Sequence, residues 1–294
     1  MYTLSKRKRI LGKVGIYIAV VLLLVWTLAP ILWMFLSSIV DKVTLLDSGP
    51  VRWPKEISFW RYKEVLDDVM PAVHGETSTK TQVFVKGMIN SIIVTISATA
   101  IALMVGGVAA YAFARLHFKG RQFLLMSMLF TQLLPVVAML IPLYMVLRNL
   151  GMIDKVPTLI VLYIGAVLPY VIWVLSGYYK TIPPELEDAA RIDGCSYLQA
   201  FYRIVLPLAK PGFVAIGALA FLLSWDEFLY ALIFTNSASA KTMTVALSEF
   251  STQYTTDYGM VMTGGCIATI IPLTLALIFQ KHIVMGLTNG GVKN

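Results

Sequence analysis

Long apolar segments recur along the chain, and they constrain its fold more than any other feature. A hydrocarbon layer about 30 Å thick needs about 20 apolar residues for each helical span. Six stretches meet this requirement, at residues 15–39, 86–113, 123–147, 157–179, 211–235 and 259–285. Hydrophobic residues make up 58% of the chain and charged residues 14%, and the mean hydropathy is +0.76. The sequence therefore predicts an all-α, polytopic membrane protein with six transmembrane helices.

The segments between these spans carry an asymmetric charge. Basic residues gather on one side of a six-span topology, at Lys6 to Lys13, Arg115 to Arg121, Lys180 to Lys210, and Lys281 to Lys293. Because lysine and arginine accumulate on the cytoplasmic side, both termini are expected in the cytoplasm. The net charge of +8 then reflects topology, and nucleic-acid binding is not expected.

The first apolar run is expected to be a retained anchor. It follows the basic run Lys6-Arg7-Lys8-Arg9, as a signal peptide would, but it is too long and no small-residue cleavage site follows. On the external side, residues 40–85 are too polar to span, and one amphipathic helix is predicted from Phe59 to Val69. This external stretch is either an interfacial segment anchored by aromatic residues or a contact for a partner.

A polar stretch between the fourth and fifth spans, about residues 180–210, cannot lie in hydrocarbon, where every backbone polar group needs an internal partner. Pro183 and Pro184 precede an acidic first turn, Gly194 permits a tight turn, and a second helix is expected to end at Pro207. The sequence predicts a cytoplasmic helix-turn-helix that docks another protein. A plain linker is the alternative, although loops of this length usually have a function.

The residues of this stretch follow a recognisable spacing. Asp188-Ala189-Ala190 is followed by three residues, then Gly194, nine residues, Ile204, one residue and Leu206-Pro207. This pattern resembles the coupling loop of ABC importer permeases. Asp188 stands where that family usually has glutamate, which keeps the charge but shortens the side chain.

Further stretches resemble the maltose-type carbohydrate permeases, in particular their shorter six-helix subunit. These stretches are Asn90-Ser91 at the opening of a span, Ala110 to Arg115 at its end, Trp225-Asp226-Glu227-Phe228, and the tail from Gly286 to Lys293. The resemblance implies a type I ABC importer permease, with a cytoplasmic N-terminus at 1–14, a permease domain at 15–285 and a cytoplasmic tail at 286–294. It also implies a bacterial or archaeal cytoplasmic membrane and import of a carbohydrate, most readily an oligosaccharide, by alternating access.

The resemblance implies partners as well. These are a homologous permease subunit, two ABC ATPase subunits, an extracytoplasmic solute-binding protein, the carbohydrate substrate and membrane lipid. The chain has no phosphate-binding loop of the type Gly-x-x-x-x-Gly-Lys-Ser/Thr. ATP and Mg are therefore expected on the partner ATPases, and no cofactor, metal or catalytic residue is assigned to this chain. The coupling contact is expected at Glu187, Asp188, Ala189, Ala190, Asp193, Gly194, Ile204, Leu206 and Pro207.

Two further segments have implied contacts and plainer alternatives. The tail residues Leu287, Thr288, Asn289, Gly290, Gly291 and Lys293 are expected to contact the ATPases, and the alternative is terminal disorder. In the external loop 236–258, the residues expected to face the binding protein are Ser237, Ser239, Lys241 and Thr242. A simple connector is the alternative for that loop.

Polar and helix-breaking residues inside the spans are candidates for a substrate path. A carboxylate at the centre of a bilayer costs about 2.5 kcal/mol or more on insertion scales, so such groups usually face a cavity or a partner. The candidates are Gln132, Pro135, Tyr170, Trp225, Asp226, Glu227 and Tyr230. Carboxylates accept bonds from sugar hydroxyls and aromatic faces stack on sugar rings. A purely structural role of the acidic pair, near a helix end, is the alternative.

Other functions remain open from the sequence alone. An ABC permease for an acidic sugar, a polyol or a glycerol phosphate fits the same pattern. A secondary transporter would need paired intramembrane ionisable groups and usually internal repeats, of which Asp226 and Glu227 supply little. A noncatalytic scaffold or receptor subunit is the third class.

Overall fold

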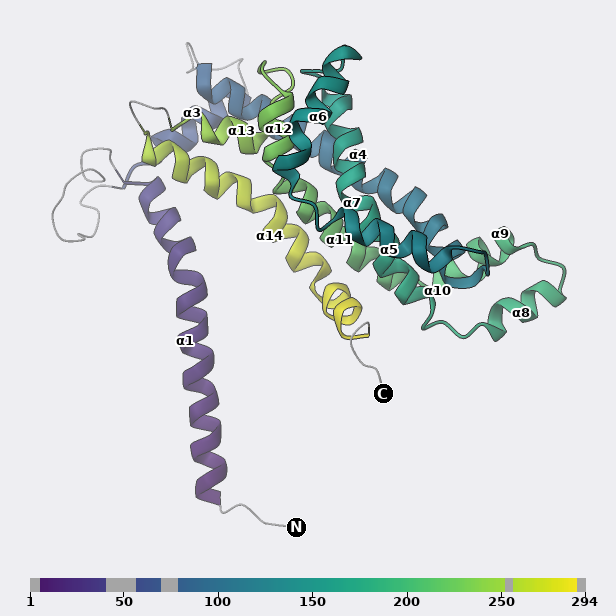
Figure 1. The fold of residues 1–294 in the computed structure, drawn as a ribbon. Coiled ribbons are helices and arrows are strands. Elements are labelled where there is room, and N and C mark those ends of the chain that lie inside the picture. Colours follow the sequence, from purple (N-terminus) through teal and green to yellow (C-terminus); the bar gives the residue numbers. More distant parts are fainter. Residues whose placement is uncertain (1–5, 41–56, 70–78, 252–255, 290–294) are drawn as a thin grey trace. The chain divides into compact units, whose positions relative to one another are not determined.

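The computed structural model describes residues 6–40, 57–69, 79–251 and 256–289, and these are almost entirely helical (Figure 1). Apart from two isolated bridges, these ranges contain no β-structure. The predicted all-α fold is confirmed. The chain divides into two compact units, which we describe separately: residues 1–76 with 250–267, and residues 77–249 with 268–294.

The first unit contains α1 (Lys6–Ser38), α3 (Trp60–Val69) and the beginning of α14 (Tyr258–Asn289). The helix predicted from Phe59 to Val69 is α3. Its Arg61 side chain is buried and donates from Nη1 to the carbonyl oxygens of Ser38 and Val40, at 3.2 and 2.7 Å. These carbonyls lie at the end of α1, where the helix leaves acceptors without intrahelical partners. Arg61 therefore fastens α3 to the end of α1.

The second unit contains the remaining helices. They are α4 (Thr79–Arg115), α5 (Arg121–Thr131), α6 (Val136–Asn149), α7 (Val156–Tyr179), α8 (Glu185–Ile192), α9 (Tyr197–Ala200), the π-helix η1 (Phe201–Val205), α10 (Leu206–Leu208), α11 (Lys210–Trp225), α12 (Leu229–Phe234), α13 (Met243–Ser248) and the rest of α14. Helix α4 packs against α7, α11 and α13, and α7 also packs against α11. Helices α4, α7 and α11 form the bundle of this unit.

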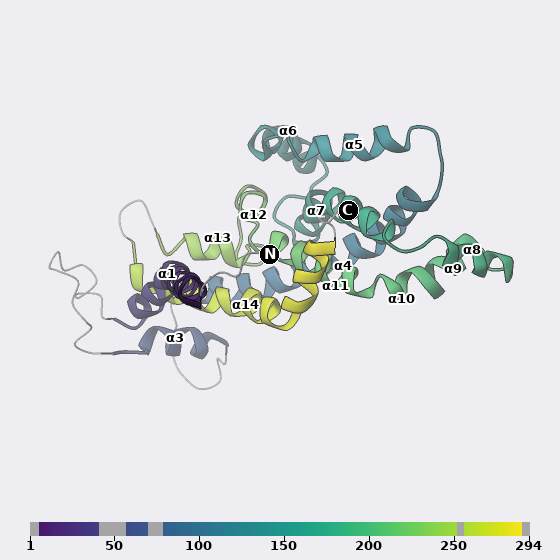
Figure 2. The same ribbon diagram turned by 90° about the horizontal axis from the view of Figure 1, so that it is seen from below.

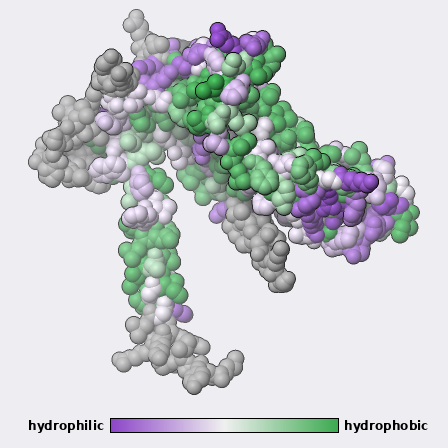
Figure 3. All heavy atoms as spheres, in the orientation of Figure 1, coloured by the Kyte–Doolittle hydropathy of each residue, from purple (hydrophilic) through white to green (hydrophobic). Residues whose placement is uncertain are grey.

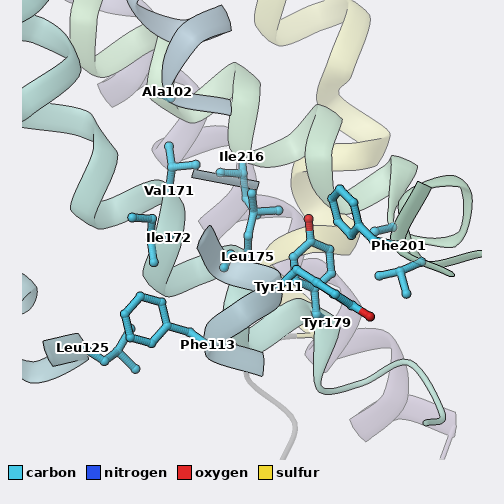
Figure 4. Close-up of a cluster of buried hydrophobic side chains, with 14 of the residues drawn as sticks. Ala102, Tyr111, Phe113, Leu125, Val171, Ile172, Leu175, Tyr179, Phe201 and Ile216 are labelled. Atoms are coloured by element: carbon cyan, nitrogen blue, oxygen red, sulfur yellow. The ribbon is translucent and has the colours of Figure 1, made fainter. Parts of the chain in front are cut away.

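Close helix approach in this bundle depends on small residues of α4. A Cβ atom on Gly106 would lie 2.8 Å from Cγ1 of Val171 in α7, and one on Gly107 would lie 2.7 Å from Cζ of Phe213 in α11. These glycines therefore permit close packing of the helices. Around them lies an apolar core of side chains from α4, α5, α7, η1 and α11 (Figure 4).

Four helices of the described chain are long and apolar enough to cross a membrane, or up to six if each of two bent pairs is one span. The predicted third span is one such pair, because α5 and α6 meet at 95°. Pro135, which lacks an N–H, precedes α6 in an extended conformation. The predicted interruption at Gln132 to Pro135 is therefore confirmed. Pro142 and Pro169, in contrast, lie inside the continuous helices α6 and α7.

The predicted fifth span also differs from the structure. It was expected as one segment at 211–235, but α11 ends at Trp225 and α12 begins only at Leu229. The residues between them include Asp226 and Glu227, whose polar side chains interrupt the apolar run. The second bent pair joins Tyr197–Leu208 to Lys210–Trp225 at 78°.

Apolar side chains cover α1 and much of the visible flank of the second unit, while hydrophilic ones gather over the α8–α9 region (Figure 3). The exposed apolar residues of α5 and α6 include Phe123, Phe130, Val137 and Ile141. This distribution agrees with helices that face lipid or other apolar partners between polar ends.

Candidate coupling site

The polar stretch between α7 and α11 forms the predicted helix-turn-helix. Helix α8 carries three acidic residues in its first turn, Glu185, Glu187 and Asp188, where negative charge favours the helix dipole. Gly194 follows with φ +90°, a left-handed conformation that glycine adopts without strain. Two views show that α8 and α9 project away from the α4–α7–α11 bundle (Figures 1 and 2). We call residues 185–208 the coupling element.

The second half of the coupling element begins with a capping box. The Ser196 hydroxyl accepts a hydrogen bond from the Gln199 backbone N–H, and the Gln199 side chain accepts one from the Ser196 N–H. Helix α9 continues through η1 into α10, which ends at Leu208, one residue beyond the expected end at Pro207. Ile204 and Leu206 are partly buried and Pro207 is exposed. Leu206 packs against the apolar core, so this end of the element belongs to the bundle.

One face of α8 is turned towards the end of α4. Glu187 and Ala190, three residues apart, are 5% and 7% exposed. The carboxylate of Glu187 accepts from Nε of Arg115 at 2.5 Å and from the hydroxyl of Tyr111 at 2.8 Å, one bond to each oxygen. Both donors belong to α4. Glu187 therefore anchors the coupling element to the bundle.

Two backbone carbonyls, one before and one after α8, also lie near these donors. Nη2 of Arg115 donates to the carbonyl of Ile182 at 2.6 Å, before α8 begins. The Tyr111 hydroxyl lies 3.4 Å from the carbonyl oxygen of Tyr197, after α8 ends. We call Tyr111, Arg115 and Glu187, with these two carbonyls, the α8 clamp.

Aromatic side chains pack against Tyr111 of the α8 clamp, and Figure 4 shows it beside Tyr179 and Phe201. The ring of Tyr111 lies 4.9 Å from that of Phe201 in η1 and 6.3 Å from that of Tyr179 in α7, between ring centroids. The Tyr179 hydroxyl donates to the carbonyl of Gly107 at 3.3 Å. These packed rings exclude water from one side of the clamp.

The opposite face of α8 is open. Asp188, Ala189, Asp193 and Gly194 are exposed, and the side chain of Ile192 is 87% exposed. The predicted coupling residues therefore fall into a buried group and an exposed group. Glu187 and Ala190 point towards the bundle, whereas Asp188, Ala189, Asp193 and Gly194 lie where another protein can reach them.

A second clamp lies nearer the start of α4. The side-chain amide of Asn90 donates to the carbonyl oxygens of Ser239 and Lys241 at 3.0 and 2.9 Å. The hydroxyl of Ser91 accepts from the backbone N–H of Met243 at 2.9 Å. We call these contacts the loop clamp. Asn90 and Ser91 were expected to open the second span, but α4 already begins at Thr79 and both residues lie inside it.

The loop clamp holds the loop that follows α12 close to α4. A Cβ atom on Gly87 would lie 2.9 Å from the carbonyl oxygen of Thr242, so the loop backbone runs directly over the helix. Thr242 itself is 2% exposed, and Nζ of Lys241 forms an ion pair with Glu249 at 2.5 Å. Ser239 is exposed and Ser237 half-buried. Of the residues expected to meet the binding protein, Ser239 is thus the most accessible and Thr242 the least.

Asp154 fixes the beginning of the same loop, and no sequence pattern pointed to it. It has φ 61°, and its carboxylate accepts from the backbone N–H groups of Asn236 and Ser237 at 2.8 and 2.9 Å. Partial burial raises the pKa of Asp154, but the hydrogen bonds from Ser237 and Asn236 and the charge of Lys241 together outweigh it. The net pKa lies below the ordinary value of 3.8.

The candidate substrate-path residues have separate roles. Trp225 is 2% exposed, and its ring stacks on Phe221 with centroids 5.8 Å apart. The Glu227 carboxylate accepts from the backbone N–H groups of Tyr230 and Ala231, so it caps the start of α12. Asp226 is exposed, and within the described ranges its side chain forms no hydrogen bond or ion pair. Glu227 therefore has the structural role that was the alternative for the acidic pair. Asp226 has no such role among the described residues and is available for another one.

The other candidates lie at the interrupted third span and on α7. Nε2 of Gln132 donates to the carbonyl of Ala166 at 3.0 Å, which ties the α5–α6 break to α7. Pro135 is exposed and Tyr170 is half-buried. No hydrogen bond or ring contact among the described residues joins Gln132 or Tyr170 to the Trp225–Tyr230 segment.

The predicted tail contacts fall at the end of the chain. Gly290, Gly291 and Lys293 lie outside the described residues, and so does the part of the loop 236–258 at 252–255. For Leu287, Thr288 and Asn289 the structure describes only the backbone, which continues α14 four residues beyond the expected end of the span at 285.

A polytopic helical membrane protein with a projecting docking element is the class that this fold and site define. The family model for the binding-protein-dependent transport system inner membrane component matches residues 102–288. The chain belongs to this family, and it is a membrane-embedded transporter subunit. The predicted resemblance to the ABC importer permeases is confirmed.

Curated relatives match over most of their length. The chain is 35% identical to the trehalose transport system permease protein SugB of Mycobacterium tuberculosis, over 91% of this chain and 93% of the relative. It is 30% identical to the diacetylchitobiose uptake system permease protein DasC of Streptomyces coelicolor, over 98% and 99%. It is 31% identical to the trehalose/maltose transport system permease protein MalG of Thermococcus litoralis, also over 98% and 99%.

A solved structure shares the fold. A chain of a bacterial ABC transporter involved in the import of the acidic polysaccharide alginate aligns with a TM-score of 0.74 and 23% identity, covering 96% of this chain and 99% of that one. The predicted permease fold is thereby confirmed.

Proposed function

We propose that this chain is a permease subunit of an ATP-driven importer that carries an oligosaccharide across the cytoplasmic membrane. The observation that carries the proposal is the identity of 30–35%, over nearly the whole chain, to permeases named for trehalose, diacetylchitobiose and trehalose/maltose. Each of these names denotes a disaccharide system. A neutral disaccharide or short oligosaccharide is therefore the proposed substrate.

The proposed complex contains a homologous permease subunit, two ATPase subunits that bind ATP and Mg, and an extracytoplasmic binding protein. The coupling element docks on an ATPase through its open face, where Ile192 offers an exposed apolar side chain between the acidic residues Asp188 and Asp193. Apolar contact at the centre and charge at the rim suit a protein interface. The tail residues Leu287, Thr288, Asn289, Gly290, Gly291 and Lys293 are proposed to contact the ATPases as well.

The proposed orientation places both termini and the coupling element in the cytoplasm and the loop 236–249 outside. Basic residues at the ends of α4 and α7 and within the coupling element support this orientation. ATP-driven closure of the ATPases displaces the coupling element and opens the permease outward, where Ser239 and its neighbours face the binding protein. Asp226, with no partner among the described side chains, is the proposed polar contact for the sugar in this chain.

A second candidate substrate has a specific observation in its favour. The chain is 32% identical, over 96% of its length, to the sulfoquinovosyl glycerol transport system permease protein SmoH of Agrobacterium fabrum. A sugar derivative of that kind is therefore the alternative substrate class for the same transport mechanism.

Uptake by the reconstituted complex tests the proposal. The chain is co-expressed with its partner permease, ATPases and binding protein, and placed in proteoliposomes. Radiolabelled trehalose, maltose, diacetylchitobiose and sulfoquinovosyl glycerol are then offered with and without internal ATP. We expect ATP-dependent accumulation of a disaccharide. Accumulation that follows an ion gradient, with no ATPase in the purified complex, would overturn the proposal in favour of a secondary transporter.

A further inference from the structure

We propose that Tyr111 and Arg115 are positioning residues that make the end of α4 move together with α8, so that a displacement of the coupling element is passed to the whole of α4. This inference rests on the proposed function, because it assumes that an ATPase displaces the coupling element. Beyond the proposed function, it identifies the side chains of this permease that transmit the displacement.

The α8 clamp meets the chain at three points, before, within and after α8. Glu187 is held within the helix, the carbonyl of Ile182 is held before it, and the carbonyl of Tyr197 is approached after it. The two donors, Tyr111 and Arg115, stand one turn apart on α4, so they form one face of that helix. A helix held at one point can pivot, whereas the bonds to Ile182 before α8 and to Glu187 within it oppose both pivoting and sliding.

The chemistry of the contact favours transmission of force over simple packing. Apolar surfaces that meet can slide with little change in energy, because the hydrophobic effect has no direction. Hydrogen bonds weaken steeply away from their preferred distance and angle. Both oxygens of Glu187 are engaged, and Arg115 uses Nε and Nη2 on two separate acceptors. Displacement of α8 alone would therefore break several charge-assisted bonds at once.

The other end of the transmission is the loop clamp. Helix α4 runs without interruption from Thr79 to Arg115, and it carries Asn90 and Ser91 as well as Tyr111 and Arg115. At about 1.5 Å rise per residue, the two clamps stand roughly 30 Å apart on one helix. A shift of the α4 end therefore reaches the backbone of Ser239, Lys241 and Met243, which the loop clamp holds.

A purely structural ion pair is the competing explanation, and the two make different predictions. If the α8 clamp only stabilised the fold, its loss would lower the amount of assembled complex but leave the coupling ratio, sugar transported per ATP hydrolysed, unchanged. If it transmits movement, the assembled complex would still hydrolyse ATP while the coupling ratio falls.

The test uses the full complex in proteoliposomes, with whichever of trehalose, maltose or diacetylchitobiose the wild type accumulates. Tyr111→Phe removes one hydroxyl and keeps the ring, and Glu187→Gln keeps the shape of the side chain and removes its charge. Tyr178→Phe is the matched control, because the Tyr178 hydroxyl forms no hydrogen bond among the described residues. ATPase copurification, ATP hydrolysis and uptake are measured for each.

We expect Tyr111→Phe to lower the coupling ratio about threefold and Glu187→Gln about tenfold, since bonds to a charged group are lost. ATPase copurification should stay near the wild-type level in both, and Tyr178→Phe should match the wild type throughout. Should Glu187→Gln fail to assemble, the milder Tyr111→Phe decides. A wild-type coupling ratio in Tyr111→Phe overturns the inference. Absence of ATP-dependent uptake by the wild type, in contrast, marks failure of the proposed function itself.

Discussion

The two clamps on α4 hold their targets by different chemistry. The loop clamp uses a neutral amide and a hydroxyl, and each of its bonds ends on a backbone group of the loop. The α8 clamp uses an ion pair, and its centre is the single carboxylate of Glu187. Contacts to backbone depend on the path of the loop and little on its side chains. Contacts to a buried carboxylate depend on one residue, so the α8 clamp is the more vulnerable of the two.

The largest effect is expected from removing one partner of the ion pair. Glu187→Ala leaves the Arg115 guanidinium without its carboxylate in a mostly buried site, where the pair's side chains are 12% and 7% exposed. Breaking such a pair costs about 3–5 kcal/mol. Thermal unfolding of the purified complex in detergent should show a clear loss of stability. Glu185→Ala, on the exposed part of the same helix, should change stability by less than about 0.5 kcal/mol. Equal losses in the two variants would show that Glu187 has no special role.

Loss of the Asn90 amide, its main donor, should weaken the loop clamp. Asn90→Ala removes two hydrogen bonds and leaves the carbonyl oxygens of Ser239 and Lys241 without these donors. An unsatisfied buried acceptor costs about 1–3 kcal/mol, and the lower end of that range is expected here because both bonds are only part-buried. Hydrogen exchange of the backbone at residues 237–243 should become faster, with little change in the coupling element. An equal rise in both places would contradict this expectation, because it would mean that the fold loosens generally and that Asn90 has no local role in holding the loop.

Substitutions at the turn after α8 can distinguish the effect of backbone strain from the effect of lost docking. Gly194 and Gly120 have φ +90° and +83°, and a Cβ on either would meet nothing within 4 Å. A tryptophan at either position therefore brings similar backbone strain, about 1–2 kcal/mol. Only Gly194 lies in the coupling element. Gly194→Trp should lose ATPase copurification while Gly120→Trp retains it, with normal membrane insertion of both. Retention of the ATPases by Gly194→Trp would contradict docking through the coupling element.

Much of the coupling element was predictable from local sequence, because its signals act over a few residues. The acidic first turn predicted α8 and Gly194 predicted the turn. Pro135 likewise predicted the break between α5 and α6, although the angle between those helices depends on packing. Which face of α8 is buried was harder to predict from the sequence. The pair Glu187 and Ala190, three residues apart, was a signal for a buried face, but nothing local distinguished it from the exposed face with Asp188.

The contacts that hold the site together could not be predicted, because they join distant parts of the chain. Asn90 meets backbone groups about 150 residues away, and its targets are carbonyls that carry no sequence signal. The role of Glu227 as a cap likewise required the end of α11 at Trp225, which the apolar pattern of 211–235 concealed. Asp154 was missed for the same reason, since its partners are backbone N–H groups of a later loop.

The smallest effect is expected at Asp154, which sharpens the picture of the loop end of α4. Its pKa lies below 3.8 in the folded protein, because backbone donors and Lys241 favour the charged form despite partial burial. A lowered pKa means stability that is fully present above the ordinary value and is lost as the pH falls through the folded one. Because the group is partly open to solvent, the contribution should be below about 1 kcal/mol. The difference in unfolding temperature between the wild type and Asp154→Asn should therefore be small but measurable at pH 6, and should shrink below pH 3.8. A difference that stays constant across that range would mean that Asp154 acts through its shape and hydrogen bonds, and not through its charge.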